Sequence, residues 1–283
     1  MAFDPRLTPA RPELAARHLE GVVAAARFVE GKTYDVIDPQ APVRRAPAPD
    51  AALLTEALMG ERVVVYETND EGWAWGQLQA DDYVGWLPLA ALAEAGAVST
   101  DKVTALRTLM FPGPDIKLPP LAGLPLGARL AIVRHEKSFA VTAAGGHVPA
   151  QHLAPIDTME PDFVTVAKRF LGVPYLWGGK TSLGIDCSGL VQVALTACGI
   201  PCPRDSDMQE RALGTPVVAD RDFSNLRRGD LIFWPGHVAI MRDATTIIHA
   251  NAHRMAVTVE PVSEAIARIR TTGCEVSNSK RLQ

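Results

Sequence analysis

The sequence has few cysteines, no long apolar run and no excess of positive charge, and each shortage excludes a class of protein. All four cysteines lie in the last third of the 283 residues. The one close pair, Cys198 and Cys202, has no second pair to complete a zinc site or a disulfide framework. No apolar stretch approaches the length of a membrane-spanning helix. The net charge of −4 and the lack of a basic stripe argue against nucleic-acid binding.

The beginning of the sequence lacks the features of a secretory signal. Residues 1–9 contain an aspartate, an arginine and two prolines, without the basic start and apolar core of a signal peptide. We therefore expect a cytoplasmic protein whose thiols stay reduced. No metal is expected, because His135, His147 and His152 lack the spacing of metal ligands, and no cofactor is predicted.

Changes in composition divide the chain into four predicted segments. Residues 1–32 include an alanine-rich run with one apolar helical face, which indicates a helix or an irregular strap packed on the body. Residues 33–95 contain short apolar runs separated by turns, a pattern typical of a small β-barrel. Residues 99–156 repeat that pattern more weakly and without its aromatics, which indicates a second, degenerate barrel that acts as a spacer.

The last segment, residues 160–283, begins with helices and continues with strands. A helix is predicted over 160–171, with Pro161 in its first turn and Gly172 past its end, and a second helix begins near Cys187. The strand-like runs that follow are 230–234, 237–241, 246–250 and 255–261, and a final helix is expected over 262–270. This order indicates an α+β domain with an antiparallel sheet.

The residues around Cys187 place its thiol at the start of a helix. Asp186 is a good N-cap, the apolar pattern begins at Leu190, and Gly199 ends it. In the first turn, unpaired backbone N–H groups and the helix dipole favour a thiolate. The alternative is a buried structural cysteine, the commonest state of a free cysteine. Position alone leaves the two interpretations about even.

Two histidines favour the catalytic interpretation. If Asp243 lies at the tip of a hairpin, His237 and His249 are each six residues from it and face each other on one side of the sheet. Cys187 then attacks an amide carbonyl, His237 takes the thiol proton and later protonates the leaving amine, and His249 orients His237. Backbone N–H groups at the helix start, including that of Cys187, hold the oxyanion. Asn251, on the same face as His249, is the second choice for the orienting role.

Five motifs follow one another through the last segment. They are Tyr-Leu-Trp-Gly-Gly (175–179), Gly-Ile-Asp-Cys-Ser-Gly-Leu-Val-Gln (184–192), Arg-Arg-Gly-Asp-Leu-Ile-Phe-Trp (227–234), Gly-His-Val-Ala-Ile (236–240) and Ile-Ile-His-Ala (247–250). In this order they resemble the NlpC/P60 family of papain-like cysteine peptidases. The resemblance implies a papain-like domain with helices packed on an antiparallel sheet, and it matches Cys187, His237 and His249 to the catalytic triad.

The strands of residues 33–95 carry a second resemblance. The stretches 60–65, 72–75 and 83–88 are similar in order and composition to a bacterial SH3 (SH3b) domain. Two small SH3b β-barrels ahead of the peptidase domain look like the dipeptidyl-peptidase VI branch of the family. That branch implies hydrolysis of the γ-D-Glu–L-diamino acid bond, with diaminopimelate or Lys, in murein peptides that have a free N-terminal L-Ala.

The resemblance also implies a set of substrate-binding residues. Tyr175 matches an aromatic residue beside the nucleophile and Trp177 a wall of the pocket, with loop or core packing as the alternative for each. Asp186 and Ser188 match residues that bind the substrate's amine and carboxylate, although Asp186 could act only as the N-cap. The other candidates are Ser206 and Arg204 for the D-Glu carboxylate, Tyr83 as the residue that closes over the N-terminal Ala, and Glu56 or Glu67 for the free amine.

Several functions are compatible with these residues. The leading hypothesis is a cytoplasmic peptidase that recycles murein tripeptides or other peptidoglycan-derived peptides, without a nucleic-acid or membrane partner. A secreted endopeptidase that remodels peptidoglycan is less favoured because no signal peptide is found. A non-catalytic wall-peptide binder is disfavoured because all three triad positions are intact. An acyltransferase on the same scaffold uses the same triad and is distinguished only by its acyl acceptor.

Overall fold

The computed structural model describes residues 3–282, which form two compact units divided between Thr158 and Met159. This division falls between the predicted segments 99–156 and 160–283. No helix among the described residues combines the length and the apolar character that a membrane span requires. No group of three or more His, Cys, Asp or Glu side chains in the same residues is arranged to hold a metal ion.

The first unit begins with a small three-stranded sheet. Strands β1 (Ala10–Arg11), β2 (Leu14–Ala16) and β3 (Phe28–Val29) pair in that order, with a 3-10 turn, η1 (Arg17–Leu19), after β2. Of the two alternatives predicted for this region, the helix is therefore wrong, and the irregular strap is the one that fits. All three residues of β2 are fully buried, whereas an amphipathic helix would leave part of any such run exposed. Consecutive buried side chains fit a strand that is covered on both faces.

Arginine side chains attach this three-stranded sheet to the larger sheet that follows it in the chain. The guanidinium of Arg11 lies over two rings, with Cζ 4.2 Å from the centroid of Trp75 and 4.9 Å from that of Trp86. The same guanidinium pairs with Glu67, which also binds Arg27 at 2.5 Å. The N-terminal segment is thus a strap on the aromatic face of the larger sheet, held by cation–π contacts and by one shared carboxylate.

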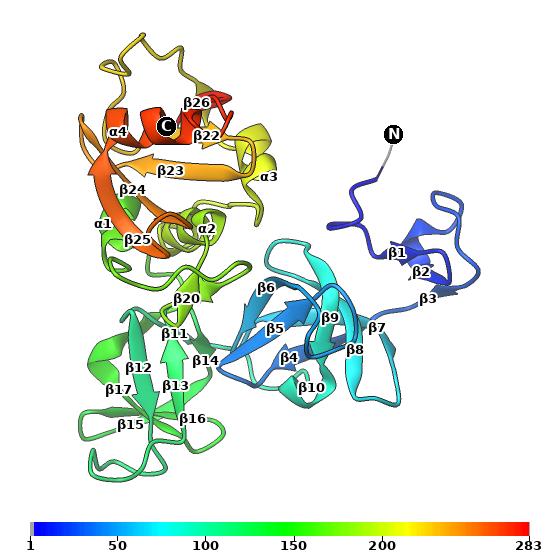
Figure 1. Cartoon of the computed structure of the whole chain (residues 1–283). Helices are drawn as coiled ribbons and strands as arrows, with labels where there is room; N and C mark the ends of the chain where they lie inside the picture. Colours follow the sequence, from blue (N-terminus) through cyan, green and yellow to red (C-terminus); the bar gives the residue numbers. More distant parts are fainter. Residues whose placement is uncertain (1–2, 283) are drawn as a thin grey trace. The chain divides into compact units, whose positions relative to one another are not determined.

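The next part of the first unit is a seven-stranded antiparallel sheet in the order β10-β4-β7-β8-β9-β5-β6 (Figure 1). Its strands are β4 (Lys32–Val36), β5 (Gln40–Arg44), β6 (Leu53–Leu58), β7 (Arg62–Thr68), β8 (Trp73–Leu78), β9 (Val84–Pro88) and β10 (Leu92–Glu94), with η2 (Leu89–Ala91) before the last. Gly60 turns the chain between β6 and β7 at a φ of 79°, where a Cβ would lie 2.3 Å from the carbonyl oxygen of Arg129. Only glycine fits both the backbone conformation and the close approach.

The rest of the first unit consists of three small sheets around a separate core. Their strands are β11 (Asp101–Val103), β12 (Arg107–Met110), β13 (Ala122–Pro125), β14 (Arg129–Leu130), β15 (Ile132–Glu136), β16 (Phe139–Thr142), β17 (His147–Pro149) and β18 (Leu153–Pro155), with η3 (Ala150–His152) before β18. Val103, Leu124, Leu130 and Val148 form the centre of the core.

The second unit is a six-stranded antiparallel sheet with helices on both faces. The strand order is β21 (Thr215–Pro216), β26 (Asn278–Arg281), β22 (Leu231–Trp234), β23 (His237–Met241), β24 (Thr246–Asn251) and β25 (Ala256–Pro261). Figure 1 shows α4 (Val262–Arg270) on one side of this sheet, and α1 (Phe163–Lys168) and α2 (Cys187–Ala197) on the other. The predicted α+β domain, with helices packed on an antiparallel sheet, is confirmed for this unit.

Most helix boundaries follow the predicted capping residues. Asp162 caps α1, which starts later than predicted and leaves Pro161 outside, and Gly172 follows its end with a φ of 83°. Gly199, with a φ of 75°, follows α2 as predicted. One helix was not predicted. It is α3 (Ser206–Ala212), which lies in the polar stretch after α2, where no apolar periodicity indicates a helix. A short hairpin, β19 (Lys180–Thr181) and β20 (Gly184–Ile185), precedes α2.

Candidate active site

Cys187 is the first residue of α2, and the loop before it is packed closely against this first turn. Asp186 caps the helix, because its Oδ1 accepts a hydrogen bond from the Gly189 N–H at 2.7 Å. A Cβ at Gly189 would lie 2.4 Å from the carbonyl oxygen of Gly179, so only glycine permits this contact. The glycines of the motif therefore fix the position of the thiol, which is 5% exposed.

Burial controls the protonation of this thiol. Desolvation raises the pKa of Cys187 to about 12, and the negative charge of Asp186 adds to the increase. Hydrogen bonds from the backbone N–H groups of Val238 and Ser188 and the charge of Arg204 oppose it. The thiolate predicted from the helix position is therefore not the resting state, since desolvation outweighs the favourable field at the helix start. Attack by Cys187 requires a base.

Two histidines supply that base, although their register differs from the predicted one. Ile240 pairs with Ile248 and Met241 with Ile247, so the hairpin is centred on Ala244, one residue later than predicted. The resulting shift of two residues keeps both histidines on one face of the sheet. Their rings meet diagonally, with His237 Nε2 at 2.9 Å from His249 Nδ1 and ring centroids 5.1 Å apart. The Val238 N–H that reaches the thiol is adjacent to His237 in β23.

The environment of His237 keeps its imidazole neutral. Desolvation lowers the pKa of His237 to about 3, and electrostatic interactions with His249 and Arg268 add to the effect, with Glu260 opposing them. A neutral imidazole beside a protonated thiol can take the thiol proton as the sulfur attacks. The resting pair is thus thiol and imidazole, and charge separates only during the reaction.

One carboxylate behind the histidines was missed in the sequence. Glu260, in β25, accepts at Oε1 from Nε2 of His249 at 2.7 Å and also pairs with Arg268 of α4. Asn251, the second choice for the orienting role, instead donates from Nδ2 to Thr258 Oγ1 at 2.8 Å and accepts from the Arg254 N–H. Glu260 lies two residues after Thr258, the strand partner of His249. This diagonal position was the only available signal that its carboxylate reaches His249.

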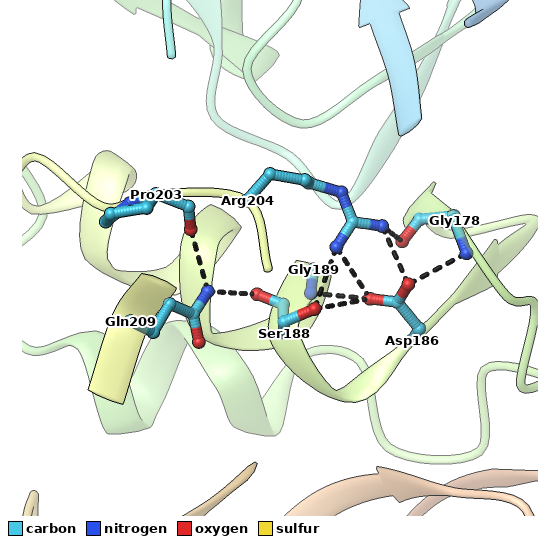
Figure 2. Close-up of polar contacts among 8 residues, drawn as sticks. Gly178, Asp186, Ser188, Gly189, Pro203, Arg204 and Gln209 are labelled. Carbon is cyan, nitrogen blue, oxygen red and sulfur yellow. Dashed lines mark hydrogen bonds and ion pairs between the residues drawn. The ribbon is translucent and has the colours of Figure 1, made fainter. Parts of the chain in front are cut away.

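Asp186 and Arg204 form a buried ion pair next to the nucleophile (Figure 2). Arg204 donates from Nη1 to Asp186 Oδ1 at 2.9 Å and from Nη2 to Oδ2 at 2.8 Å, with no part of its side chain exposed. Oδ2 of Asp186 also accepts from the Gly178 N–H at 2.8 Å. The bidentate pair thus joins the loop, the helix start and the segment before α3. Asp186 is the N-cap, as one interpretation held.

Ser188 and Gln209 extend this network. Arg204 Nη1 also donates to Ser188 Oγ at 2.9 Å, as Figure 2 shows. Gln209 of α3 donates from Nε2 to the carbonyl oxygens of Ser188 and Pro203, each at 2.9 Å. Arg204 and Ser188 are therefore part of the framework that holds the nucleophilic turn. Ser206, the first residue of α3, lies two residues after Arg204 and is partly exposed.

The two aromatic candidates have different surroundings. Desolvation raises the pKa of Tyr175, and the charges of Cys187 and Asp186 add to this, so its phenol lies near the nucleophile. Trp177 is 67% exposed, which contradicts core packing as the reason for a tryptophan at this position. An exposed tryptophan two residues from Tyr175 is available to contact a ligand.

The remaining three candidates belong to the first unit. Tyr83 precedes β9 and is 3% exposed, and Glu56 lies in β6 and is 5% exposed. Glu67 is occupied by Arg11 and Arg27. The structure joins His237 to His249 and Arg204 to both Asp186 and Ser188, and it places Tyr83, Glu56 and Glu67 in the first unit.

The geometry of the second unit defines a nucleophilic thiol site. Cys187 attacks a carbonyl carbon while His237 accepts its proton, and the amine then leaves with that proton before water cleaves the thioester. The backbone N–H of Cys187 has no hydrogen-bond partner among residues 3–282, so it is available to the oxyanion. This is the site of a cysteine peptidase.

Comparisons with known proteins locate two domains in the chain. The model of the NlpC/P60 family matches residues 172–276, and that of the bacterial dipeptidyl-peptidase SH3 domain matches residues 43–92. The chain therefore contains an NlpC/P60 domain and a bacterial SH3 domain, as the sequence resemblance predicted, and it is a hydrolase, a peptidase of the cysteine type.

Individual relatives agree with this assignment. The chain is 35% identical to dipeptidyl-peptidase 6 of Lysinibacillus sphaericus over 115 residues, which are 41% of each protein. It is 27% identical to a gamma-D-glutamyl-L-lysine dipeptidyl-peptidase of Bacillus cereus over 243 residues, 75% of this chain and 71% of the relative. A solved NlpC/P60 family protein from Bacillus cereus has the same fold, with a TM-score of 0.71, 21% identity and coverage of 88% of this chain and 99% of the other.

We expect kcat/KM to persist at acid pH. A base with the ordinary imidazole pKa near 6.5 is only about 3% neutral at pH 5, which would reduce kcat/KM roughly 25-fold from its value at pH 7. His237, with a pKa of about 3, stays neutral at both values, so kcat/KM should fall by less than about twofold. Initial rates of peptide cleavage between pH 4.5 and 8 measure this, and an acid limb near pH 6.5 would contradict the assignment.

Proposed function

We propose that this peptidase hydrolyses the bond between γ-D-Glu and an L-diamino acid, diaminopimelate or Lys, in murein peptides with a free N-terminal L-Ala. The observation that carries the proposal is the Cys187–His237–His249 site in a chain that also has the SH3 domain of bacterial dipeptidyl-peptidases. The relative from Bacillus cereus is named for the γ-D-glutamyl-L-lysine bond. Its match extends over 75% of this chain, beyond the NlpC/P60 domain alone.

The residues of the second unit fit a small anionic peptide. Tyr175 is close to the thiol, Trp177 is exposed, and Ser188 lies beside the helix start, where its Oγ accepts a hydrogen bond from Arg204. We assign the D-Glu carboxylate to Arg204, Ser188 and Ser206. In keeping with the sequence resemblance, we assign Asp186 to the amine end of the substrate.

We also propose that residues 99–156 are a second SH3b module. In the first barrel, a proline ends β9, η2 follows, and β10 pairs with the opening strand β4. In the second, a proline ends β17, η3 follows, and β18 pairs with the opening strand β11. Two segments that close in the same way support a tandem repeat.

The cellular role that we propose is recycling of murein peptides in the cytoplasm. All four cysteines are free, which fits a reducing compartment. The competing role is secreted remodelling of peptidoglycan, in which the substrate is the intact polymer.

One assay distinguishes these roles. The purified protein is incubated with free L-Ala-γ-D-Glu-diaminopimelate, with the same peptide N-acetylated on Ala, and with intact sacculi. We expect cleavage of the free peptide and a loss of kcat/KM of about 100-fold or more on acetylation, because the acetylated nitrogen is neutral and loses its charge-assisted hydrogen bond to the enzyme. Equal cleavage of acetylated and free peptide would refute the requirement for a free amine, and preferential cleavage of sacculi would favour the remodelling role.

A further inference from the structure

We propose that Glu260, held by Arg268, is a positioning residue that sets the tautomers of both active-site histidines so that Nδ1 of His237 is free to accept the thiol proton. The inference rests on the proposed function for the substrate used to test it, whereas the hydrogen-bond geometry does not depend on that function. The contacts that carry it are a single line of hydrogen bonds from β23 through β24 to β25 and α4.

The carboxylate of Glu260 is the acceptor at one end of this line of hydrogen bonds. The hydrogen bond from His249 lowers the pKa of Glu260 to about 2, desolvation opposes this, and Arg268 lowers it further. Glu260 is therefore ionised and can only accept hydrogen bonds. Oε1 lies 2.7 Å from Nε2 of His249, so this ring nitrogen carries the hydrogen. The side chain of His249 is 1% exposed, so the ring is shielded from bulk solvent.

The second step follows from the number of protons on a neutral imidazole. With its one hydrogen on Nε2, neutral His249 has a lone pair at Nδ1. The 2.9 Å contact to Nε2 of His237 must then be donated by His237. Neutral His237 in turn carries its hydrogen on Nε2, which leaves the lone pair on Nδ1. One carboxylate thus determines which nitrogen of a ring two hydrogen bonds away acts as the base.

Arg268 offsets the negative charge of Glu260. The carboxylate therefore accepts a hydrogen bond from His249 without favouring a second proton on that ring. If His249 were protonated on both nitrogens, it would donate to His237 Nε2, force the hydrogen of His237 onto Nδ1 and remove the base. An unopposed carboxylate favours that charged form. Arg268 contacts the same Oε1 and offsets its charge, so the pair presents an acceptor with little net charge.

Two substitutions of Glu260 separate positioning from simple structural support. Glu260→Ala removes the hydrogen-bond acceptor of His249 and should lower kcat about 10- to 100-fold. KM should be unchanged, because Glu260 contacts His249 and not the substrate. Glu260→Gln keeps a carbonyl acceptor for His249 and should restore kcat to within about fivefold of the wild type. Glu275→Ala, which removes the exposed partner of Arg270, is the matched control and should change neither constant. Thermal unfolding verifies that all three variants are folded.

A spectroscopic measurement tests the tautomers without any substrate. Long-range ¹H–¹⁵N spectra of the protein labelled at its histidines, assigned with His237→Asn and His249→Asn, report which ring nitrogen carries hydrogen. We expect Nε2–H in both rings of the wild type and a mixture in Glu260→Ala. Nδ1–H in either wild-type ring, or unchanged tautomers and kcat in the alanine variant, would overturn the proposal. If the wild type does not cleave the tripeptide, the proposed substrate fails, while the spectra still decide the role of Glu260.

Discussion

Replacing Cys187 by alanine should lower kcat/KM by about 10⁴-fold or more, because no other group in the site can form the covalent intermediate. The thiol is 5% exposed and its side chain is small, so the fold should remain intact. The measurement is hydrolysis of L-Ala-γ-D-Glu-L-Lys, followed by chromatography, together with the unfolding temperature of each variant.

A second cysteine provides the control for this experiment. Cys198, directly after α2, is also a free thiol but lies at the opposite end of the helix. Cys198→Ala should keep activity within about twofold. If Cys187→Ala retains substantial turnover, the nucleophilic mechanism is wrong. Equal loss in both variants would point to a general effect of thiol removal on stability.

Replacing Arg204 by methionine should destabilise the second unit by about 3–5 kcal/mol, the usual cost of breaking a buried ion pair by removing one partner. The substitution leaves Asp186 charged and largely buried beside the helix start, and it removes the donors to Ser188 Oγ and to the Gly179 carbonyl. Because Asp186 and Ser188 flank Cys187, kcat/KM should fall as well. Urea unfolding followed by tryptophan fluorescence measures the change in the free energy of unfolding.

The matched control for Arg204 is an exposed arginine in the adjacent helix. Arg211 pairs with Asp207 across one turn of α3, and its side chain is 63% exposed. Surface pairs of this kind contribute only about 0.3–0.5 kcal/mol, so Arg211→Met should cause little change. Similar destabilisation by both substitutions would show that the buried pair has no special role in the structure.

The sequence was sufficient to predict the peptidase domain because its signals are local. The Asp186 cap and Gly199 after the helix fix α2 through short-range hydrogen bonds and backbone conformation. The alternation of strand residues places His237 and His249 on one face even when the register is wrong by two residues, since only a shift of one would separate them.

What the sequence did not predict depends on contacts between distant segments or on burial. Arg204 and Asp186 are 18 residues apart, and neither motif indicates that they form a bidentate pair. Glu260 follows His249 by eleven residues and becomes relevant only once β25 is placed beside β24. The protonation of Cys187 follows from desolvation, which no sequence position specifies. The alternatives of a helix and an irregular strap stayed open for the segment that contains β2, because an alanine-rich run fits both until its burial is known.

The identity of the bond cleaved is the most direct test of this account. Wild-type protein is incubated with free L-Ala-γ-D-Glu-L-Lys and with the diaminopimelate peptide, and the products are identified by mass spectrometry. The account predicts L-Ala-γ-D-Glu and the free diamino acid, with neither product formed by Cys187→Ala. Release of L-Ala with an intact γ-D-Glu-diamino acid dipeptide, or no cleavage of either peptide by the wild type, would contradict it.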